Sequence, residues 1–258
     1  MFFNSLLAVD RGCMTMDTIN AVSSWIKEQV EKAGAKGIVL GLSGGIDSAV
    51  VAALARRSLG HDVLGLLLPC HSHQQDSEDA LTVAGHLGLE TVTVDLTPVF
   101  DLLLTLLPSA GTMVAANLKP RLRMMTLYHF AGFKKYLVAG TGNKSEIAVG
   151  YFTKYGDGGA DLLPLGDMLK SQVRDLAVQL RLPKAIVDKP PSAGLLPGQT
   201  DEDELNISYA ELDQALKAIA AKRDEHVPPG VRQRVENLIK NSEHKRLPIP
   251  VFKISTTL

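Results

Sequence analysis

Cysteine is scarce in this chain, which has two among its 258 residues, Cys13 and Cys70. Two cysteines are too few for a disulfide framework, so a disulfide-held fold is excluded and a reducing cytoplasm is the simplest expectation. No window approaches the roughly 20 consecutive apolar residues that a membrane-spanning helix needs. The apolar start, Met1 to Val9, has no basic lead and makes a poor secretory signal. We therefore expect a cytoplasmic protein with no membrane partner.

An excess of charge of one sign is also missing. The chain has 27 Lys and Arg residues and 28 Asp and Glu residues, for a formal net charge of −1. A chain this close to neutral has no global basic field, so we expect no nucleic-acid partner. What is present is an ordinary globular balance of 45% apolar and 21% charged residues. That balance predicts a packed core and little disorder.

Short apolar runs alternate with helical patterns through the first two-thirds of the chain. This alternation is typical of βαβ units around a parallel sheet, with right-handed crossovers that place helices on both faces. We therefore predict an α/β fold with a doubly wound, Rossmann-like parallel sheet. The expected strands are 38–40, 63–68, 91–94 and 136–139, and the expected helices are 17–34, 46–59, 77–87, 117–132, 170–180, 209–221 and 231–240.

The domain organisation is expected to be simple. We predict a single domain over residues 1–258 with no second core, in which the sheet region runs from about residue 17 to residue 188. Proline, glycine, serine and lysine then become frequent, which predicts a flexible loop over residues 188–206. Residues 207–258 return to helical patterns and form the expected helical C-terminal extension.

A glycine-rich segment joins the first predicted strand directly to a predicted helix. Glycine lets backbone N–H groups approach a ligand closely, and the positive end of a helix favours an anion. The lysine of the Walker A motif and the G-x-G-x-x-G fingerprint are both missing here. A tight strand–helix turn is the alternative, but the full string favours a phosphate-binding loop for ATP. Its sequence is Gly41-Leu42-Ser43-Gly44-Gly45-Ile46-Asp47-Ser48.

A second polar, glycine-rich segment, Gly140 to Glu146, follows the fourth predicted strand. Ligands of open parallel sheets bind at the carboxyl ends of the strands, so we expect the chemistry at that edge. Asp47 and Glu146 follow different strands and could converge there. A carboxylate beside phosphate is unfavourable unless a divalent cation bridges the two, and hard oxygen ligands suit Mg²⁺. The alternative for Glu146 is a solvated helix start.

The string from Ser43 to Ser48 resembles the SGGxDS loop of the N-type ATP pyrophosphatases (the PP-loop family). These enzymes cleave ATP to AMP and pyrophosphate while adenylating a carbonyl oxygen. Further segments resemble the NAD synthetases and keep the order of that family from about residue 37 to residue 250. They are Asn117–Met124, Gly140–Glu146, Thr153–Gly159, Pro191–Ala193, Pro197–Leu205 and His244–Arg246.

The resemblance implies an adenine nucleotide alpha hydrolase-like fold and a ligase that forms a C–N bond. Deamido-NAD would be adenylated on its carboxylate by ATP with Mg²⁺, and ammonia would displace AMP to give NAD. Glutamine-dependent members carry a large amidase domain ahead of the loop. Because 42 residues precede Ser43, we expect the ammonia-dependent form. Relatives are homodimers, so the resemblance also implies a homodimer.

The resemblance also implies roles for single residues. Asp47 and Lys170 are the expected catalytic residues, and Asp47 and Glu146 are the expected Mg²⁺ ligands. A lysine at a helix start opposes the dipole, which favours a functional Lys170 near the leaving pyrophosphate over an exposed lysine. ATP is expected at Gly41, Leu42, Ser43, Gly44, Gly45, Ile46, Asp47, Ser48, Thr141, Lys170 and Ser192, and deamido-NAD at Arg121, Lys154, Asp161, His244 and Lys245.

Three alternative functions stay open at this point. A tRNA-thiolating enzyme usually needs catalytic cysteines, and Cys13 and Cys70 are poorly placed for that role. A GMP synthetase-like enzyme carries extra dimerisation and glutaminase segments that this sequence lacks. A non-catalytic nucleotide sensor on the same sheet has little need for two carboxylates and a lysine together.

Overall fold

The protein is built around one parallel sheet. The computed structural model describes residues 14–196, 198, 200–222 and 227–254, so Cys13 and Pro197 lie outside the described residues. Four strands form a sheet in the order β3-β2-β1-β4, and every neighbouring pair is parallel. The strands, each within two residues of its predicted bounds, are β1 Ile38–Gly41, β2 Val63–Leu67, β3 Glu90–Thr93 and β4 Leu137–Ala139.

The strand order reverses direction next to β1. The chain moves outward from β1 to β2 and β3, and then returns to the other side of β1 to form β4. Leu40 accordingly pairs with Gly65 of β2 and with Ala139 of β4. In open parallel sheets a crevice forms at this switch point, outside the carboxyl ends of the strands. The segments 41–48 and 140–146 leave the sheet on either side of it.

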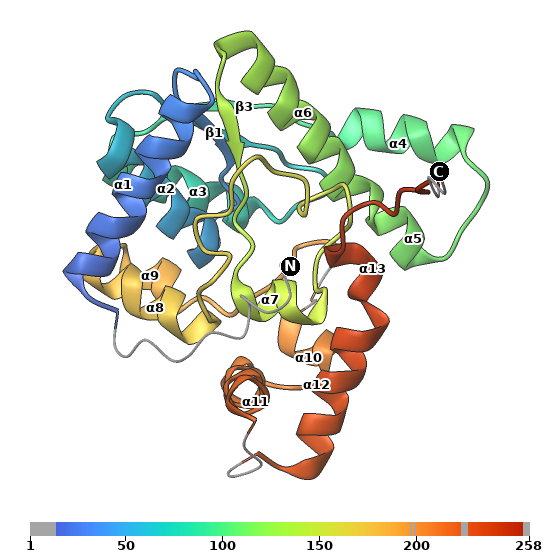
Figure 1. Ribbon diagram of the computed structural model, residues 1–258. Helices are drawn as coiled ribbons and strands as arrows, with labels where there is room; N and C mark the ends of the chain where they lie inside the picture. The colour runs from blue at the N-terminus through green and yellow to red at the C-terminus, as the bar shows by residue number, and fades with distance from the viewer. Residues whose placement is uncertain (1–13, 197, 199, 223–226, 255–258) are drawn as a thin grey trace.

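Helices cover both faces of the sheet (Figure 1). Side chains alternate along a strand, so Ile38 and Leu40 pack in one apolar cluster and Val39 packs in another. This arrangement confirms the predicted doubly wound fold. The first cluster contains residues of α1 Met16–Lys32, α2 Ile46–Leu59, α3 Gln74–Leu87, α8 Lys170–Gln179 and α9 Lys184–Val187, and the second contains residues of α4 Thr97–Leu106 and α6 Leu118–Lys134.

The helix that follows the glycine-rich loop, α2, is the most deeply buried. Its residues Ala49 to Ala55 are all buried, and it packs against β1, β2, α1, α3 and α8. A helix that is apolar on every side belongs in the interior of a protein. The start of α2, which carries Asp47, is therefore held by packing on several sides.

The C-terminal helices pack around a third apolar cluster, beside the two clusters on the faces of the sheet. Leu212, Leu216 and Val235 of the tail meet Val149 and Leu169 there. Several helices here and earlier were not expected, because a helix of one or two turns shows too few residues to reveal its period. The remaining helices are α5 Thr112–Ala116, α7 Lys144–Val149, α10 Asp201–Leu205, α11 Tyr209–Ala221, α12 Pro229–Asn241 and α13 Glu243–Arg246.

The ends of two helices follow from local backbone features. Asn206 ends α10 in the left-handed conformation, with φ of 51°, which asparagine tolerates better than most residues. Helix α3 begins at Gln74 and not at Ser77, because the polar first turn hides its start. Among the described residues, no helix has both the length and the apolarity needed to cross a membrane.

Candidate active site

Hydrogen bonds of Ser43 and Ser48 hold the loop between β1 and α2 in a compact turn. The hydroxyl oxygens of Ser43 and Ser48 lie 3.1 Å apart, and Ser48 donates to the carbonyl of Gly45 at 2.9 Å. No side chain caps the start of α2. The first N–H groups of that helix therefore point to the end of the sheet, as in known phosphate-binding helix starts.

Gly44 is required by the geometry of this loop. Its φ is +77°, and a Cβ added there would lie 2.4 Å from the carbonyl oxygen of Asp76 in α3. A side chain at position 44 would push the loop away from α3, and the positive φ would also strain the backbone of any residue that has a Cβ. The glycine-rich signal in the sequence thus has a local steric cause.

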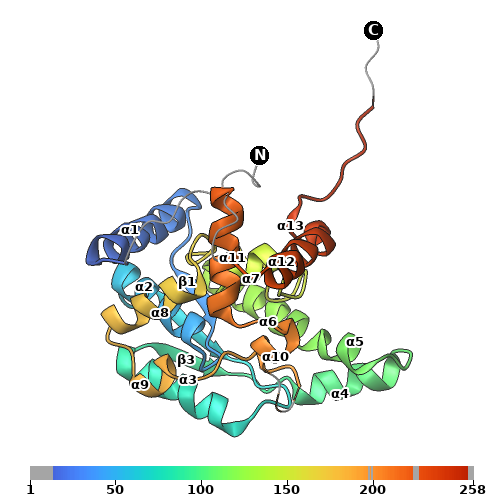
Figure 2. The same ribbon diagram turned by 90° about the horizontal axis from the view of Figure 1, so that it is seen from below.

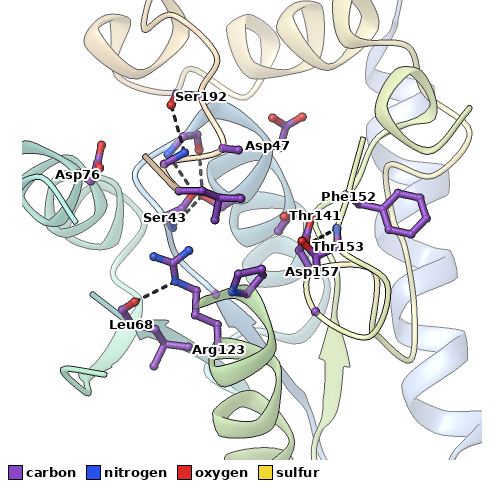
Figure 3. Close-up of a pocket in the computed structure, with 18 of the residues that line it drawn as sticks. Ser43, Asp47, Leu68, Asp76, Arg123, Thr141, Phe152, Thr153, Asp157 and Ser192 are labelled. Atoms are coloured by element: carbon purple, nitrogen blue, oxygen red, sulfur yellow. Dashed lines mark hydrogen bonds between the residues drawn. The ribbon is translucent and has the colours of Figure 1, made fainter. Parts of the chain in front are cut away.

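A cavity of about 690 Å³ opens beside this loop. Its walls come from segments far apart in the chain: the loop, the ends of β2 and β4, α6, residues 150–153, 156, 157 and 159, residues 189–196 and 198, and Lys245. Ser43, Asp47, Thr141, Arg123 and Ser192 surround the same space in Figure 3. A cavity of this size is within the range of small-molecule and cofactor sites.

Lys170 lies in the wall of this cavity as the first residue of α8. Its ammonium group forms ion pairs with Asp47 Oδ2 and, at 3.1 Å, with Glu146 Oε1. Only 9% of the Lys170 side chain is exposed. Burial by itself would lower the pKa of Lys170, but Asp47 and Glu146 raise it above its ordinary value. The alternative of an exposed lysine is therefore wrong, and Lys170 is a fixed cation.

Glu146 is buried too, so the alternative of a solvated helix start is wrong. Burial raises the pKa of Glu146 to about 7, against the opposing effect of Lys170. Asn143, which is fully buried, caps α7 by accepting from the N–H of Glu146 at 3.0 Å. The Asn143 amide also donates to Asp47 Oδ1 at 2.9 Å. One side chain thus fixes both carboxylates relative to each other.

Asp201 of α10 and Tyr209 of α11 complete the cluster. The hydroxyl group of Tyr209 lies 3.2 Å from Glu146 Oε1 and 2.9 Å from Asp201 Oδ2. The ring of Tyr209 lies under the Lys170 ammonium group, 4.9 Å from its centroid. Tyr151 also donates to Asp201, at 3.1 Å, and burial raises the pKa of the Asp201 carboxyl group. Helices α10 and α11 thereby become part of the site.

The five ionisable residues of this cluster all lie in the first turn of a helix. They are Asp47 of α2, Glu146 of α7, Lys170 of α8, Asp201 of α10 and Tyr209 of α11. Helix starts carry partial positive charge, so their convergence attracts an anion and offsets part of the cost of burying the carboxylates, although burial still raises the pKa of Glu146 and of Asp201. The cluster is thus suited to hold acidic side chains and phosphate side by side.

Asp47 and Glu146 fit a Mg²⁺ ion. Both present hard carboxylate oxygens toward Lys170 at the edge of the cavity. In the described part of the chain, no group of three or more His, Cys, Asp or Glu side chains could hold a metal by itself. Mg²⁺ usually binds through one or two carboxylates together with substrate phosphates, so two carboxylates agree with its chemistry.

The residues expected to contact ATP gather at this cavity, with one exception. Gly44 lies behind the loop, against α3. Ser192 is exposed and accepts from the N–H of Gly194 at 3.1 Å. The residues that line the cavity are Gly41, Leu42, Ser43, Gly45, Ile46, Asp47, Ser48, Thr141, Lys170 and Ser192.

The residues expected to contact deamido-NAD form a second group, of which only Lys245 lines the cavity. Lys154 donates to the carbonyl of His244 at 2.6 Å, and Arg121 donates to the carbonyl of Lys154 at 3.3 Å. Asp161 accepts from the N–H of Val138 and from the Tyr128 hydroxyl. The contacts of these residues with a substrate stay a prediction.

Lys189 and Lys119 hold the segment beside the cavity that was predicted as a loop over residues 188–206. Lys189 forms ion pairs with Asp76 at 2.8 Å and Asp79 at 2.5 Å, both on α3. Lys119 of α6 donates to the carbonyl of Leu195 at 2.9 Å. The loop is therefore attached to helices on both sides of the sheet.

Sequence reasoning missed several residues of the site. Asn143 could have been found, because Asn-x-x-Glu is a capping-box spacing. Arg123, which donates to the Leu68 carbonyl at 3.1 Å, and Asp201 stand in segments that resemble the family but had no role assigned within them. Tyr209 carries no local signal.

A parallel doubly wound sheet, a glycine-rich loop without a Walker lysine and polar segments at the switch point together define an α/β protein of the PP-loop class. The model of the family described as NAD synthase matches residues 18–249. The chain belongs to this NAD synthase family.

Relatives of known name agree with that assignment. The NH(3)-dependent NAD(+) synthetase of Archaeoglobus fulgidus is 44% identical over 243 residues, which cover 93% of this chain and 98% of that protein. Among solved structures, the NMN synthetase of Francisella tularensis has a TM-score of 0.86 and 37% identity, covering 93% and 98% of the two chains. The NH3-dependent NAD synthetase of Campylobacter jejuni, in complex with the nitrate ion, has a TM-score of 0.82 and 30% identity, covering 93% and 100%.

Proposed function

We propose that this protein is an ammonia-dependent NAD synthetase. ATP adenylates the carboxylate of deamido-NAD with release of pyrophosphate, and ammonia then displaces AMP to give NAD. The observation that carries the proposal is Lys170, held between Asp47 and Glu146 beside a phosphate-binding loop. The similarity to NH(3)-dependent NAD(+) synthetases over nearly the whole chain supports the same reaction.

The chain contributes by positioning and by charge. The N–H groups at the start of α2 and the hydroxyl groups of Ser43 and Ser48 would bind the ATP phosphates. Lys170 would neutralise the charge that develops on the leaving pyrophosphate. No side chain needs to become a nucleophile, because the substrate carboxylate attacks ATP and ammonia attacks the adenylate.

Asp47 and Glu146 would hold Mg²⁺. Bound there, the ion supplies charge neutralisation and orients the triphosphate. The charge balance of the buried cluster supports this role: three carboxylates, with Asp201 included, share the single ammonium group of Lys170. An added cation would compensate the buried negative charge that raises the pKa of Glu146.

The dinucleotide would extend from the cavity toward the basic group formed by Arg121, Lys154, His244 and Lys245. Arg121 and Lys154 come from the sheet region, and His244 and Lys245 come from the C-terminal tail. The basic group therefore forms only when the tail packs against the sheet region. A dinucleotide carries two phosphates, for which Arg and Lys are suitable partners. The loop fastened by Lys119 and Lys189 would exclude water from the adenylate, which water would otherwise hydrolyse.

We further propose a cytoplasmic homodimer. Exposed apolar side chains gather on α4 and α5, where Leu102, Leu106 and Val114 are 59%, 70% and 63% exposed. Residues 247–254 extend away from the helices in Figure 2, and Phe252 within them is 89% exposed. Apolar surface of this kind supports association with a second copy. Sedimentation equilibrium at micromolar concentration tests the dimer, and a monomer throughout would refute it.

One assay tests the reaction. The purified chain is incubated with ATP, MgCl₂, ammonium and deamido-NAD, and NAD and AMP are quantified together. We expect equimolar NAD and AMP, and no product when glutamine replaces ammonium. Nicotinic acid mononucleotide should be run in parallel, because one solved relative is an NMN synthetase. Absence of NAD above background, or a clear preference for the mononucleotide, would refute the proposed substrate.

A further inference from the structure

The helix that carries Lys170 has no side chain of its own that accepts from the N–H groups of its first two residues. Its N-cap residue is Leu169, which has no polar side-chain atom, and Gln172 of the same helix accepts from the N–H of Leu169 at 2.9 Å. The next N–H groups, those of Lys170 and Ser171, find no partner within the helix. Lys170 is 8% exposed, so its N–H group needs a partner from another part of the chain.

Two buried residues supply partners for both N–H groups. Ser145, which is fully buried in α7, accepts from the N–H of Lys170 at 3.0 Å. Asp213, 4% exposed in α11, accepts from the N–H of Ser171 at 2.9 Å. The Ser145 hydroxyl also donates to the second carboxylate oxygen of Asp213. Ser145 of α7 and Asp213 of α11 are thus hydrogen-bonded to each other and together cap the start of α8.

Both ends of this cap are fixed by the catalytic cluster itself. Ser145 is followed directly by Glu146, and Asp213 lies one helical turn after Tyr209, whose hydroxyl group contacts Glu146. Ser145 and Asp213 therefore connect the backbone of Lys170 to the elements that carry its ion-pair partner. Neither residue lines the cavity, so neither is placed to touch a substrate.

We infer that Ser145 and Asp213 are positioning residues for Lys170: they set the start of α8 so that the Lys170 ammonium group stays between Asp47 and Glu146. The inference rests on the proposed function of Lys170. Asp213 accepts from the N–H of Ser171 and from the Ser145 hydroxyl, so it acts through the backbone at the start of α8.

The effect on turnover follows from this geometry. Ser145→Ala removes the acceptor for the Lys170 N–H and leaves one oxygen of Asp213 without its donor. A displacement of a catalytic group by about 1 Å can cost about 10²-fold in rate. We expect Ser145→Ala to lower kcat for AMP formation by about 10- to 100-fold, with the KM for deamido-NAD within about threefold of the wild type.

A double-mutant cycle separates positioning from general stability. If Ser145 acts through Lys170, then Ser145→Ala should cost less than about twofold in a Lys170→Met background, because contacting residues in one network are not additive. Ser58→Ala is the matched control. It removes another serine hydroxyl between helices, bonded to the Ser23 carbonyl of α1 at 2.5 Å, and it should leave kcat unchanged.

Amide hydrogen exchange gives a readout that needs no activity. In Ser145→Ala, the amides of Lys170 and Ser171 should exchange about tenfold faster than in the wild type, and Ser58→Ala should leave them unchanged. Asp213→Asn keeps one acceptor and should lose less kcat than Asp213→Ala. If Asp213→Ala does not fold, Ser145→Ala and Asp213→Asn carry the test.

The outcomes are distinct from those of the function assay. A wild type without NAD formation would refute the proposed function, and the exchange data would still decide whether the cap holds the start of α8. An active wild type with full kcat in Ser145→Ala would refute the inference. So would losses that multiply in the double variant, or unchanged exchange at Lys170 and Ser171.

Discussion

Neutralising Glu146 is the sharpest test of the electrostatics at this site. Burial raises the pKa of Glu146 from 4.5 to about 7. A carboxyl group with a higher pKa in the folded state binds its proton more tightly there than in the unfolded chain. The free energy of unfolding therefore falls as the pH rises from 4.5 to about 7. Its side chain is 16% exposed, so solvent screens the effect little.

The magnitude follows from the shift. At about 1.4 kcal/mol for each tenfold change in proton affinity, ionised Glu146 costs the metal-free fold about 3 kcal/mol above pH 7. Glu146→Gln removes this pH-dependent cost. Gln has one acceptor oxygen where Glu146 has two, so it loses either the bond from the N–H of Asn143 or those from Lys170 and Tyr209, a pH-independent loss of about 1 kcal/mol. We expect the variant to be less stable than the wild type at pH 5 and about 2 kcal/mol more stable at pH 8.

Urea unfolding between pH 5 and pH 8, with a chelator present, measures this difference. Asp201 also has a raised pKa, but it is present in both proteins, so the difference between the two curves isolates Glu146. Parallel curves of unfolding free energy against pH would refute the reasoning. Addition of Mg²⁺ extends the test. The ion should stabilise the wild type more at pH 8 than at pH 6, because a proton competes for Glu146, and it should not stabilise Glu146→Gln.

Three other substitutions, one of them with a matched control, test separate parts of the site. Asp47→Asn should lower NAD and AMP formation by about 10²-fold or more with an unchanged far-UV circular dichroism spectrum, and full activity would remove Asp47 from the metal. Gly44→Ala forces a side chain into a left-handed conformation against Asp76, so the free energy of unfolding should drop by about 1–2 kcal/mol or more. Gly85→Ala is the control: Gly85 lies in α3, the helix that carries Asp76, and an added Cβ there meets nothing within 4 Å. This substitution should stabilise the protein by about 0.5–1 kcal/mol in thermal unfolding. Lys189→Met removes both ion pairs to α3, so the KM for ATP should rise about tenfold in steady-state kinetics; an unchanged KM would show that these pairs do not place the loop.

The parts of the site that could be read from the sequence are those with a local cause. The loop from Gly41 to Ser48 was identifiable because a strand, a left-handed glycine and a helix start follow one another directly. Asp47 and Glu146 could be expected to converge because each follows a parallel strand, and such strands end at one edge. The capping box at Asn143 is equally local, because its Asn-x-x-Glu spacing stands in the sequence.

The residues that follow α9 show the opposite case. Asp201, Tyr209 and Asp213 lie 31 or more residues beyond Lys170 in the chain, and no local pattern around them predicts a contact with the Lys170 cluster. They reach the site because Leu212, Leu216 and Val235 pack with Val149 and Leu169 in a third apolar cluster. That packing places α11 against α7 and α8.

Hydrophobic period, glycine positions and strand order are properties of short segments, and they were enough for the doubly wound sheet, the phosphate-binding loop and the acidic pair. Which side chains cap α8, share Lys170 and bury Glu146 depends on how helices separated by many residues pack together. The pKa of Glu146 is a clear example: a glutamate in the first turn of a helix has nothing unusual in its sequence, and its burial by distant elements gives it a pKa of about 7.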